Sequence, residues 1–531
     1  MGRARVRRDK LLGSLPVIAR FCERLDVRGV VDRACPVRDV AIATHGEVIE
    51  ALIANRLTSP RPLVHVEDWA AEWAAEEVFG VAPAALNDDR IGRALDAVAP
   101  ELAGIVGSIG ARAIAEFGID VSRIHWDMTS MSLFGDYDSP EEGFATPSYG
   151  HPKDRRPDLK QVQTGLAVTG DGGIPIFHRA FDGRAGEVNQ VVGAMESLRS
   201  MCAERRFLLV GDSKLVSYDN LAQMASAGVS FIAPASKSYV GADVLAACDF
   251  DAAAPVDYVA ARDADKPPER RGTYRVIEDR WAMSPKAKRD PTLELRRVFV
   301  WSSADADATA TARAKKLTRA TEDLDSLTRG LGGRFYPTPA AVSARVALIA
   351  AKRRVGDYLR ADVGVDPDDQ PTLAWRFDPD ALEAETATDG WYCLLTNLSA
   401  GSVDAAGVLV RYKGQEVVER RYGAFKGPLA VAPVFLKNNR RIEALLSVIC
   451  LALLIFCLVE REARRAIAPE LKMTGFPGRP TARPTGRLIF DALSRLTLIP
   501  ATANSPPIVP APTGIQARIL ELLDVNPAHS R

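Results

Sequence analysis

Asp127 and Asp212 each stand at the end of a run of residues typical of a β-strand. Residues 123–127 read Arg-Ile-His-Trp-Asp, and residues 206–212 read Arg-Phe-Leu-Leu-Val-Gly-Asp. These runs predict two short strands, each delivering a carboxylate at its carboxyl end. Carboxylate oxygens are the ligands that Mg²⁺ prefers, so acids at the ends of neighbouring strands are candidate metal ligands. Because each pattern is common by chance, the prediction needs a third acid.

A further carboxylate, Glu419, lies in a predicted helix that ends before Gly427-Pro428, because a Gly-Pro pair is a strong helix stop. At 100° per residue, one stripe about 60° wide on this helix holds four polar residues, namely Tyr412, Gln415, Glu419 and Lys426. A solvated helix face is the simplest interpretation. The alternative is a site in which one carboxylate lies among a phenol, an amide and an ammonium group.

This spacing resembles the Tyr-Arg-Glu-Lys signature of a group of DDE transposases from bacterial insertion sequences. Tyr412, Glu419 and Lys426 match the signature, and Gln415 stands where the family usually has arginine. The glutamine at this position affects one phosphate contact and leaves the three acidic residues unchanged. In pattern, the resemblance covers roughly residues 86–465.

The resemblance implies a transposase that cleaves DNA at the ends of its element and joins the 3′ hydroxyl ends to target DNA. The implied catalytic residues, which are also the metal ligands, are Asp127, Asp212 and Glu419. The implied DNA contacts are Tyr412, Gln415 and Lys426. The implied cofactor is Mg²⁺, with Mn²⁺ as a substitute. The implied partner is double-stranded DNA, bound at terminal repeats by a homodimer or higher oligomer.

Two other functions remain open within this interpretation. The first is a related metal-dependent nuclease that cuts DNA without joining it. The second is a non-catalytic DNA-binding relative, against which the three intact acids argue. The third acid also has a competitor, because Glu416 lies three residues before Glu419. On a helix Glu416 faces about 60° away from Glu419 and outside the stripe, so we predict Glu419.

The elements around the acids follow the order three strands, helix, strand, helix, strand. Two strand-like runs, 161–169 and 174–181, are joined by Gly-Asp-Gly-Gly, a strong hairpin signal. The later patterns predict a helix over 187–202, a strand over 206–212, a helix over 217–227 and a strand over 230–235. This order predicts an α/β fold with a ribonuclease-H-like catalytic core that brings the two aspartates side by side.

The sequence predicts five segments. An all-helical N-terminal domain (1–120) precedes the first part of the core (121–235), and a large, mostly β insertion (236–390) separates it from the second part (391–465). A Pro-rich, irregular tail with a short helix follows (466–531). The N-terminal domain either binds DNA ends or serves packing or dimerisation; its basic residues include Arg3, Arg5, Arg7, Arg8, Arg90 and Arg93. Basic residues of the insertion either contact the DNA backbone or form a solvated face, namely Arg296, Arg297, Arg313, Lys315, Lys316 and Arg319.

Composition sets limits on the partners and the compartment. The net charge is +0, from 68 basic and 68 acidic residues, so DNA contacts must come from local patches. The seven cysteines include no Cys-x-x-Cys pair, and the basic N-terminus lacks the apolar segment of a signal peptide. Both features suit a cytoplasmic protein that joins the nucleoid when bound to DNA. The uncharged run over 444–459 is shorter than a membrane span and predicts a buried core helix and no membrane partner.

Overall fold

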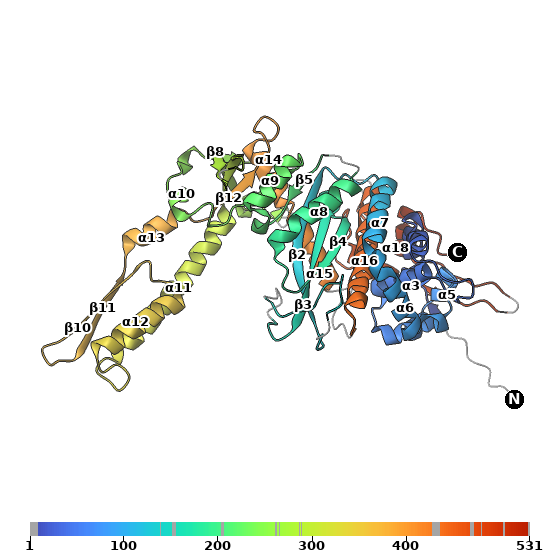
Figure 1. The fold of residues 1–531 in the computed structure, drawn as a ribbon, viewed down its shortest axis with the longest axis horizontal. Coiled ribbons are helices and arrows are strands. Elements are labelled where there is room, and N and C mark those ends of the chain that lie inside the picture. Colours follow the sequence, from blue (N-terminus) through green and yellow to red (C-terminus); the bar gives the residue numbers. More distant parts are fainter. Residues whose placement is uncertain are drawn as a thin grey trace. The chain divides into compact units, whose positions relative to one another are not determined.

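The computed structural model describes the chain from residue 9 to residue 528, except residues 138–139, 151–155, 203–205, 261–262, 265, 286, 288, 427–435, 468–471, 479 and 503–504 (Figure 1). The chain divides into two compact units: unit 1 is Met1–Ser230 with Gly414–Arg531, and unit 2 is Phe231–Lys413. The predicted basic residues Arg3, Arg5, Arg7 and Arg8 and the helix stop at Gly427-Pro428 lie outside the described residues. The division into five segments remains a prediction.

Unit 1 holds a sheet of mixed direction. Its strands are β2 (Arg123–Leu133), β3 (Lys160–Thr169), β4 (Pro175–Phe181) and β5 (Leu208–Val210), in the order β4-β3-β2-β5. The pairs β2–β3 and β3–β4 are antiparallel, and the pair β2–β5 is parallel. The predicted hairpin between β3 and β4 is confirmed. The prediction that the first strand ends at Asp127 is wrong, because pairing with β3 continues to Leu133.

The helices between the strands follow the predicted order. After β4 come α8 (Glu187–Met201), β5, α9 (Tyr218–Ser226) and β6 (Ser230–Pro234). Asn87 caps the helix that begins at Asp88, and Thr44 forms a capping box with Glu47 at the helix that begins at His45.

The N-terminal region is helical, as predicted, apart from one short strand. Its helices are α1 (Leu15–Arg24), α2 (Val27–Ala34), α3 (His45–Thr58), α4 (Val66–Glu72), α5 (Ala75–Phe79), α6 (Asp88–Val98) and α7 (Leu102–Phe117). β1 (Lys10–Leu11) pairs with β13 (Thr497–Leu498) of the tail. The tail also contains α17 (Gly486–Leu493) and α18 (Gly514–Leu522). The prediction of an irregular tail is therefore wrong around α17, whose apolar face is buried at Ile489 and Leu493.

The apolar run at 444–459 lies in α16 (Asn439–Ala466), which contacts α3, α6 and β4. By length and composition, both α16 and the stretch Asp88–Phe117 are apolar enough to cross a membrane. Within α16, however, 94% of the apolar window is buried inside the protein. The prediction of a buried core helix is confirmed.

The predicted continuous helix from Tyr412 to Lys426 is wrong. The structure has α14 (Ala405–Lys413) and α15 (Glu416–Lys426), with a turn at Gly414 and Gln415 between them. Glycine at this turn costs helix stability, and the side chain of Gln415 is engaged by β2. The angular stripe calculated along one helix therefore does not apply across the turn.

Unit 2 is built on a second set of strands. These are β7 (Ala254–Val256), β8 (Tyr274–Met283), β9 (Leu293–Ser302) and β12 (Trp391–Thr396), in the order β6-β12-β9-β8-β7. The hairpin of β10 (Leu359–Val365) and β11 (Pro371–Phe377), with α11 (Ser303–Arg329) and α12 (Pro339–Arg353), shares a separate apolar core that includes Leu324, Val342 and Tyr358. The short helices α10 (Ala242–Ala246) and α13 (Pro379–Thr386) and the helix α14 also belong to this unit. The prediction of a mostly β insertion is therefore wrong, because the two longest elements of this segment are helices of 27 and 15 residues.

Candidate active site

Strand pairing brings Asp127 and Asp212 to corresponding positions. In the parallel pair of β2 and β5, His125 lies opposite Val210. Two residues further along each chain stand Asp127, still within β2, and Asp212, just beyond β5. Residues two apart point to the same face of a strand, and neighbouring strands lie about 4.8 Å apart. The register therefore brings Asp127 and Asp212 to corresponding positions of the two neighbouring segments, one within β2 and the other just beyond β5.

Short main-chain hydrogen bonds orient both carboxylates. Asp127 accepts a hydrogen bond at Oδ1 from the Met128 N–H, at 2.8 Å. Asp212 accepts one at Oδ1 from the Lys214 N–H, at 2.9 Å, and so caps a turn of 3₁₀ helix over Ser213–Leu215. Both side chains are half-buried. Half-buried carboxylates with fixed orientation have the chemistry of ligands for a hard divalent cation.

The helix α15, which carries Glu419, packs on this part of the sheet. Its buried face consists of Val418, Tyr422 and Phe425, and it contacts β2, β3 and α16. In Figure 1 this orange helix, from late in the sequence, lies beside the cyan and green strands of unit 1. The Tyr422 hydroxyl donates to the main-chain oxygen of Asp127 at 2.6 Å and lies 3.1 Å from that of Thr164. The helix α15, which carries Glu419, is thus hydrogen-bonded to the main chain of Asp127.

Arg421 fixes the other side of α15. Its guanidinium donates to the main-chain oxygens of Gly173 and Gly172, at 2.9 and 2.5 Å, in the hairpin between β3 and β4. It also forms an ion pair with Glu460 of α16, at 3.0 Å. Burial opposes the charge of Arg421, but Cys457 and Glu460 keep its pKa above the ordinary value. The pair is therefore charged and holds α15 against two other elements.

Gln415 lies immediately before α15 and contacts β2. Its Nε2 donates to the main-chain oxygen of Trp126 at 3.3 Å, and its Oε1 lies 3.1 Å from Nδ1 of His125. His125 is fully buried, and this burial lowers its pKa to about 4, so the ring is neutral near pH 7. Gln415 therefore accepts from the Nδ1–H of a neutral imidazole.

Glu419 and Glu416 differ in their orientation within α15. At 100° per residue, Glu419 lies about 60° from Tyr422 around the helix, whereas Glu416 lies about 120° away. Glu419 is thus closer to the side chain that contacts Asp127, although it is solvent-exposed. Among the described residues, no group of three His, Cys, Asp or Glu side chains is placed to hold a metal ion. The structure gathers the two aspartates but does not bring Glu419 into a three-acid cluster.

The remaining predicted DNA contacts are only partly described. The ring of Tyr412 lies 6.4 Å from that of Tyr392 within unit 2. The next residue, Lys413, places its ammonium 4.8 Å from the ring centroid of Tyr274. The side chain of Lys426 lies outside the described residues.

Sequence reasoning missed Arg421 and Tyr422, which attach the helix to the core. A signal for the buried face was present, because Val418, Tyr422 and Phe425 recur at spacings of four and three residues. No comparable signal identifies Arg421, because its partners Gly172, Gly173 and Glu460 are distant in sequence.

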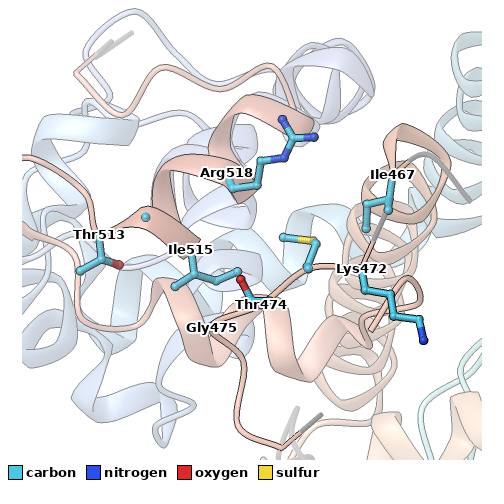
Figure 2. A pocket seen from close by; sticks show the side chains of 9 residues that line it. Ile467, Lys472, Thr474, Gly475, Thr513, Ile515 and Arg518 are labelled. Carbon is cyan, nitrogen blue, oxygen red and sulfur yellow. The ribbon is translucent and has the colours of Figure 1, made fainter. Parts of the chain in front are cut away.

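A pocket of about 460 Å³ in unit 1 is separate from these residues. Figure 2 shows that Ile467, Lys472, Thr474, Gly475, Thr513, Ile515 and Arg518 line it. None of Asp127, Asp212 and Glu419 is among its lining residues.

Comparisons with known proteins give a family match and similarities to solved structures. Residues 8–103 match the family described as "Domain of unknown function (DUF4277)". A search of curated proteins finds no match. The chain is similar to a piggyBac transposase synaptic complex with hairpin DNA, with 8% identity, 92% of this chain and 82% of that chain covered, and a TM-score of 0.37. It is also similar to the Mos1 transposase paired-end complex with the left transposon end, with 10% identity, 39% and 62% covered, and a TM-score of 0.15. Neither structural similarity, at these TM-scores, establishes the fold or the activity of this chain.

Proposed function

We propose that this protein is a DDE transposase that cleaves DNA at the ends of its element and transfers the 3′ ends to target DNA. The observation that supports it best is the parallel register of β2 and β5, which pairs His125 with Val210, two residues before Asp127 and Asp212 respectively. The helix α15, which carries Glu419, is hydrogen-bonded to the main chain of the same Asp127. Three residues far apart in sequence thus belong to one part of unit 1.

The strand arrangement of unit 1 supports a ribonuclease-H-like core. In chain order, the first three strands β2, β3 and β4 are antiparallel neighbours, and the fourth, β5, is parallel to the first. Parallel pairing of the first and fourth strands lets both deliver an acid in the same direction. The proposed chemistry requires that geometry.

The roles of the side chains follow from their chemistry. Divalent metal ions, when bound, stabilise the attacking and leaving oxygens of an in-line displacement at phosphorus. Asp127 and Asp212 would hold Mg²⁺ or Mn²⁺ from the strands, and Glu419 would supply the third carboxylate from α15. Tyr412 would donate a hydrogen bond to a DNA phosphate and Lys426 would contribute a point charge. Gln415, whose amide is engaged by β2, receives a positioning role in place of the phosphate contact.

The proposed partner is double-stranded DNA at the element ends and at the target, bound by a homodimer or higher oligomer. The proposed location is the cytoplasm, with nucleoid association through DNA. Because the net charge is +0, binding must depend on local basic groups.

The test uses the purified full-length protein and a DNA fragment that carries the inverted repeats expected on either side of its coding region. We expect cleavage at the repeat ends with Mg²⁺, none with EDTA, and joining of the 3′ ends to a target plasmid. Asp127→Asn and Asp212→Asn should each abolish cleavage while retaining end binding, since they remove charged ligands without adding bulk. Cleavage without joining would identify a nuclease, and substantial cleavage by either variant would contradict the assignment of the acids.

A further inference from the structure

The helix α15 is tied to β2 by side chains on both sides of Glu419. Before the helix, Gln415 contacts His125 and the main-chain oxygen of Trp126. One turn beyond Glu419, the Tyr422 hydroxyl donates to the main-chain oxygen of Asp127. Trp126 and Asp127 are consecutive, so both ties end on the same short length of strand. Glu419 lies between the ties.

The hydrogen bond from Tyr422 is made to the part of β2 that pairs with β3. Asp127 of β2 pairs with Leu166 of β3. The Tyr422 hydroxyl bonds to the Asp127 oxygen at 2.6 Å and lies 3.1 Å from the main-chain oxygen of Thr164, also in β3. Tyr422 is 7% exposed, so water does not easily replace its hydroxyl. The main chain that carries the first acid and the helix that carries the third therefore meet at one hydroxyl group.

Arg421 restricts the rotation of α15. Arg421 and Tyr422 are consecutive and point about 100° apart, one to the β3–β4 hairpin and the other to the β2–β3 pair. Two anchors in different directions fix both the axial position and the rotation of a helix. The rotation decides where the Glu419 carboxylate points.

We infer that Tyr422 is a positioning residue for the third acid, which sets the placement of Glu419 relative to Asp127 through the main-chain oxygen of Asp127. The inference rests on the proposed function. Tyr422 contacts neither DNA nor metal in this role. It acts by holding α15, and Gln415 supports the opposite side of Glu419.

The experiment is cleavage by full-length Tyr422→Phe over a range of Mg²⁺ concentrations. The substitution keeps the buried ring and removes only the hydroxyl that bonds to Asp127. We expect the Mg²⁺ concentration for half-maximal rate to rise about tenfold or more, since a displacement of about 1 Å at a site can cost about 100-fold in rate. Much of the rate should return at saturating Mg²⁺. Binding of Mn²⁺, measured by electron paramagnetic resonance without DNA, should weaken in parallel.

Tyr137→Phe is the matched control, because the Tyr137 hydroxyl also donates to a main-chain oxygen of unit 1, that of Phe134, at 3.1 Å. Its metal dependence should equal that of the wild type. If Tyr422→Phe does not fold, Gln415→Leu supplies the same test by removing the hydrogen bonds of Gln415 to β2. The rise in the Mg²⁺ concentration for half-maximal rate should then be smaller. An unchanged metal dependence in the folded variant, or a rate lowered by the same factor at every Mg²⁺ concentration, overturns the inference while leaving the transposase proposal intact. Absence of cleavage by the wild type overturns the proposed function and the inference with it.

Discussion

At the scale of single residues, main-chain geometry explains more of the candidate site than charge does. Asp127 and Asp212 are 85 positions apart by their numbers in the sequence, yet the pairing of His125 with Val210 brings them to corresponding positions. Each accepts a hydrogen bond from an N–H of its own segment. Carboxylate oxygens held in this way are of the kind that Mg²⁺ prefers as ligands.

The two glutamates of α15 give a direct test of the third acid. Glu419→Gln should abolish cleavage, whereas Glu416→Gln should retain most of it, because Glu419 lies about 60° from Tyr422 and Glu416 about 120°. The two substitutions are matched in chemistry and lie in the same helix, so they serve as controls for each other. Cleavage rates of the purified variants in Mg²⁺ are the measurement. If Glu416→Gln is the inactive variant, the signature spacing has been assigned to the wrong glutamate.

The buried histidine beside Asp127 predicts acid sensitivity. Burial lowers the pKa of His125 from 6.5 to about 4, so the unfolded chain takes up a proton at a higher pH than the folded one. Stability should therefore be constant above about pH 6.5 and fall as the pH drops from 6.5 toward 4, by roughly 3 kcal/mol for this group. Urea unfolding followed by circular dichroism across this range measures the slope.

His125→Asn supplies the control for this pH dependence. It should flatten the slope, although His178, whose pKa burial lowers to about 3, should retain its own share. An equal slope in wild type and variant would show that His125 takes up its proton in the folded state near its ordinary pKa.

At the scale of elements, the sequence predicted what depends on neighbouring residues and failed where distant contacts decide. The strand order, the hairpin between β3 and β4 and the buried run of α16 were all predicted. The break between α14 and α15 was not, because Gln415 is drawn to β2 by partners about 290 positions away. β2 was predicted too short for the same reason, since its second half is a strand only through pairing with β3.

The ion pair of α15 with α16 predicts a large effect on stability. Arg421→Met removes the guanidinium from Glu460, from Gly172 and from Gly173, and leaves a buried carboxylate with Arg464 as its remaining ion-pair partner. Breaking a buried pair from one side costs about 3 kcal/mol or more. Arg420→Met, at the exposed neighbouring position, is the control and should change stability by less than about 0.5 kcal/mol. The urea-unfolding midpoints of the two variants, each compared with that of the wild type, measure the two changes in stability.

At the scale of the whole molecule, a net charge of +0 means that the distribution of basic groups, not their number, determines any DNA contact. Most of the basic residues predicted in the insertion are engaged within unit 2. Arg297 pairs with Asp279, Arg313 with Asp389 and Lys316 with Glu385. Such groups have their charge compensated, so they contribute less to attraction of a phosphate backbone than the sequence indicated.

Lys315 and Arg319 differ from the others, because both are exposed on α11. They are four residues apart and lie on the same side of the helix, about 40° from each other. If α11 contacts DNA, these are the two groups that can each neutralise a phosphate. The double variant Lys315→Gln and Arg319→Gln should then reduce the slope of log affinity against log salt by about two, since each phosphate contact contributes about 0.9.

Arg313→Gln is the matched control, since it removes a charge from the same helix at a position where the charge is already paired with Asp389. It should lower the stability of unit 2 and leave the salt slope unchanged. The slope is measured by fluorescence anisotropy with an end-repeat duplex between about 50 and 200 mM salt, a range over which such slopes are resolved. A slope that stays unchanged in the double variant would mean that this face of α11 is solvated. DNA binding would then have to rely on basic groups elsewhere, of which Arg90 is engaged with the main-chain oxygen of Ala43 and Arg93 with Asp89.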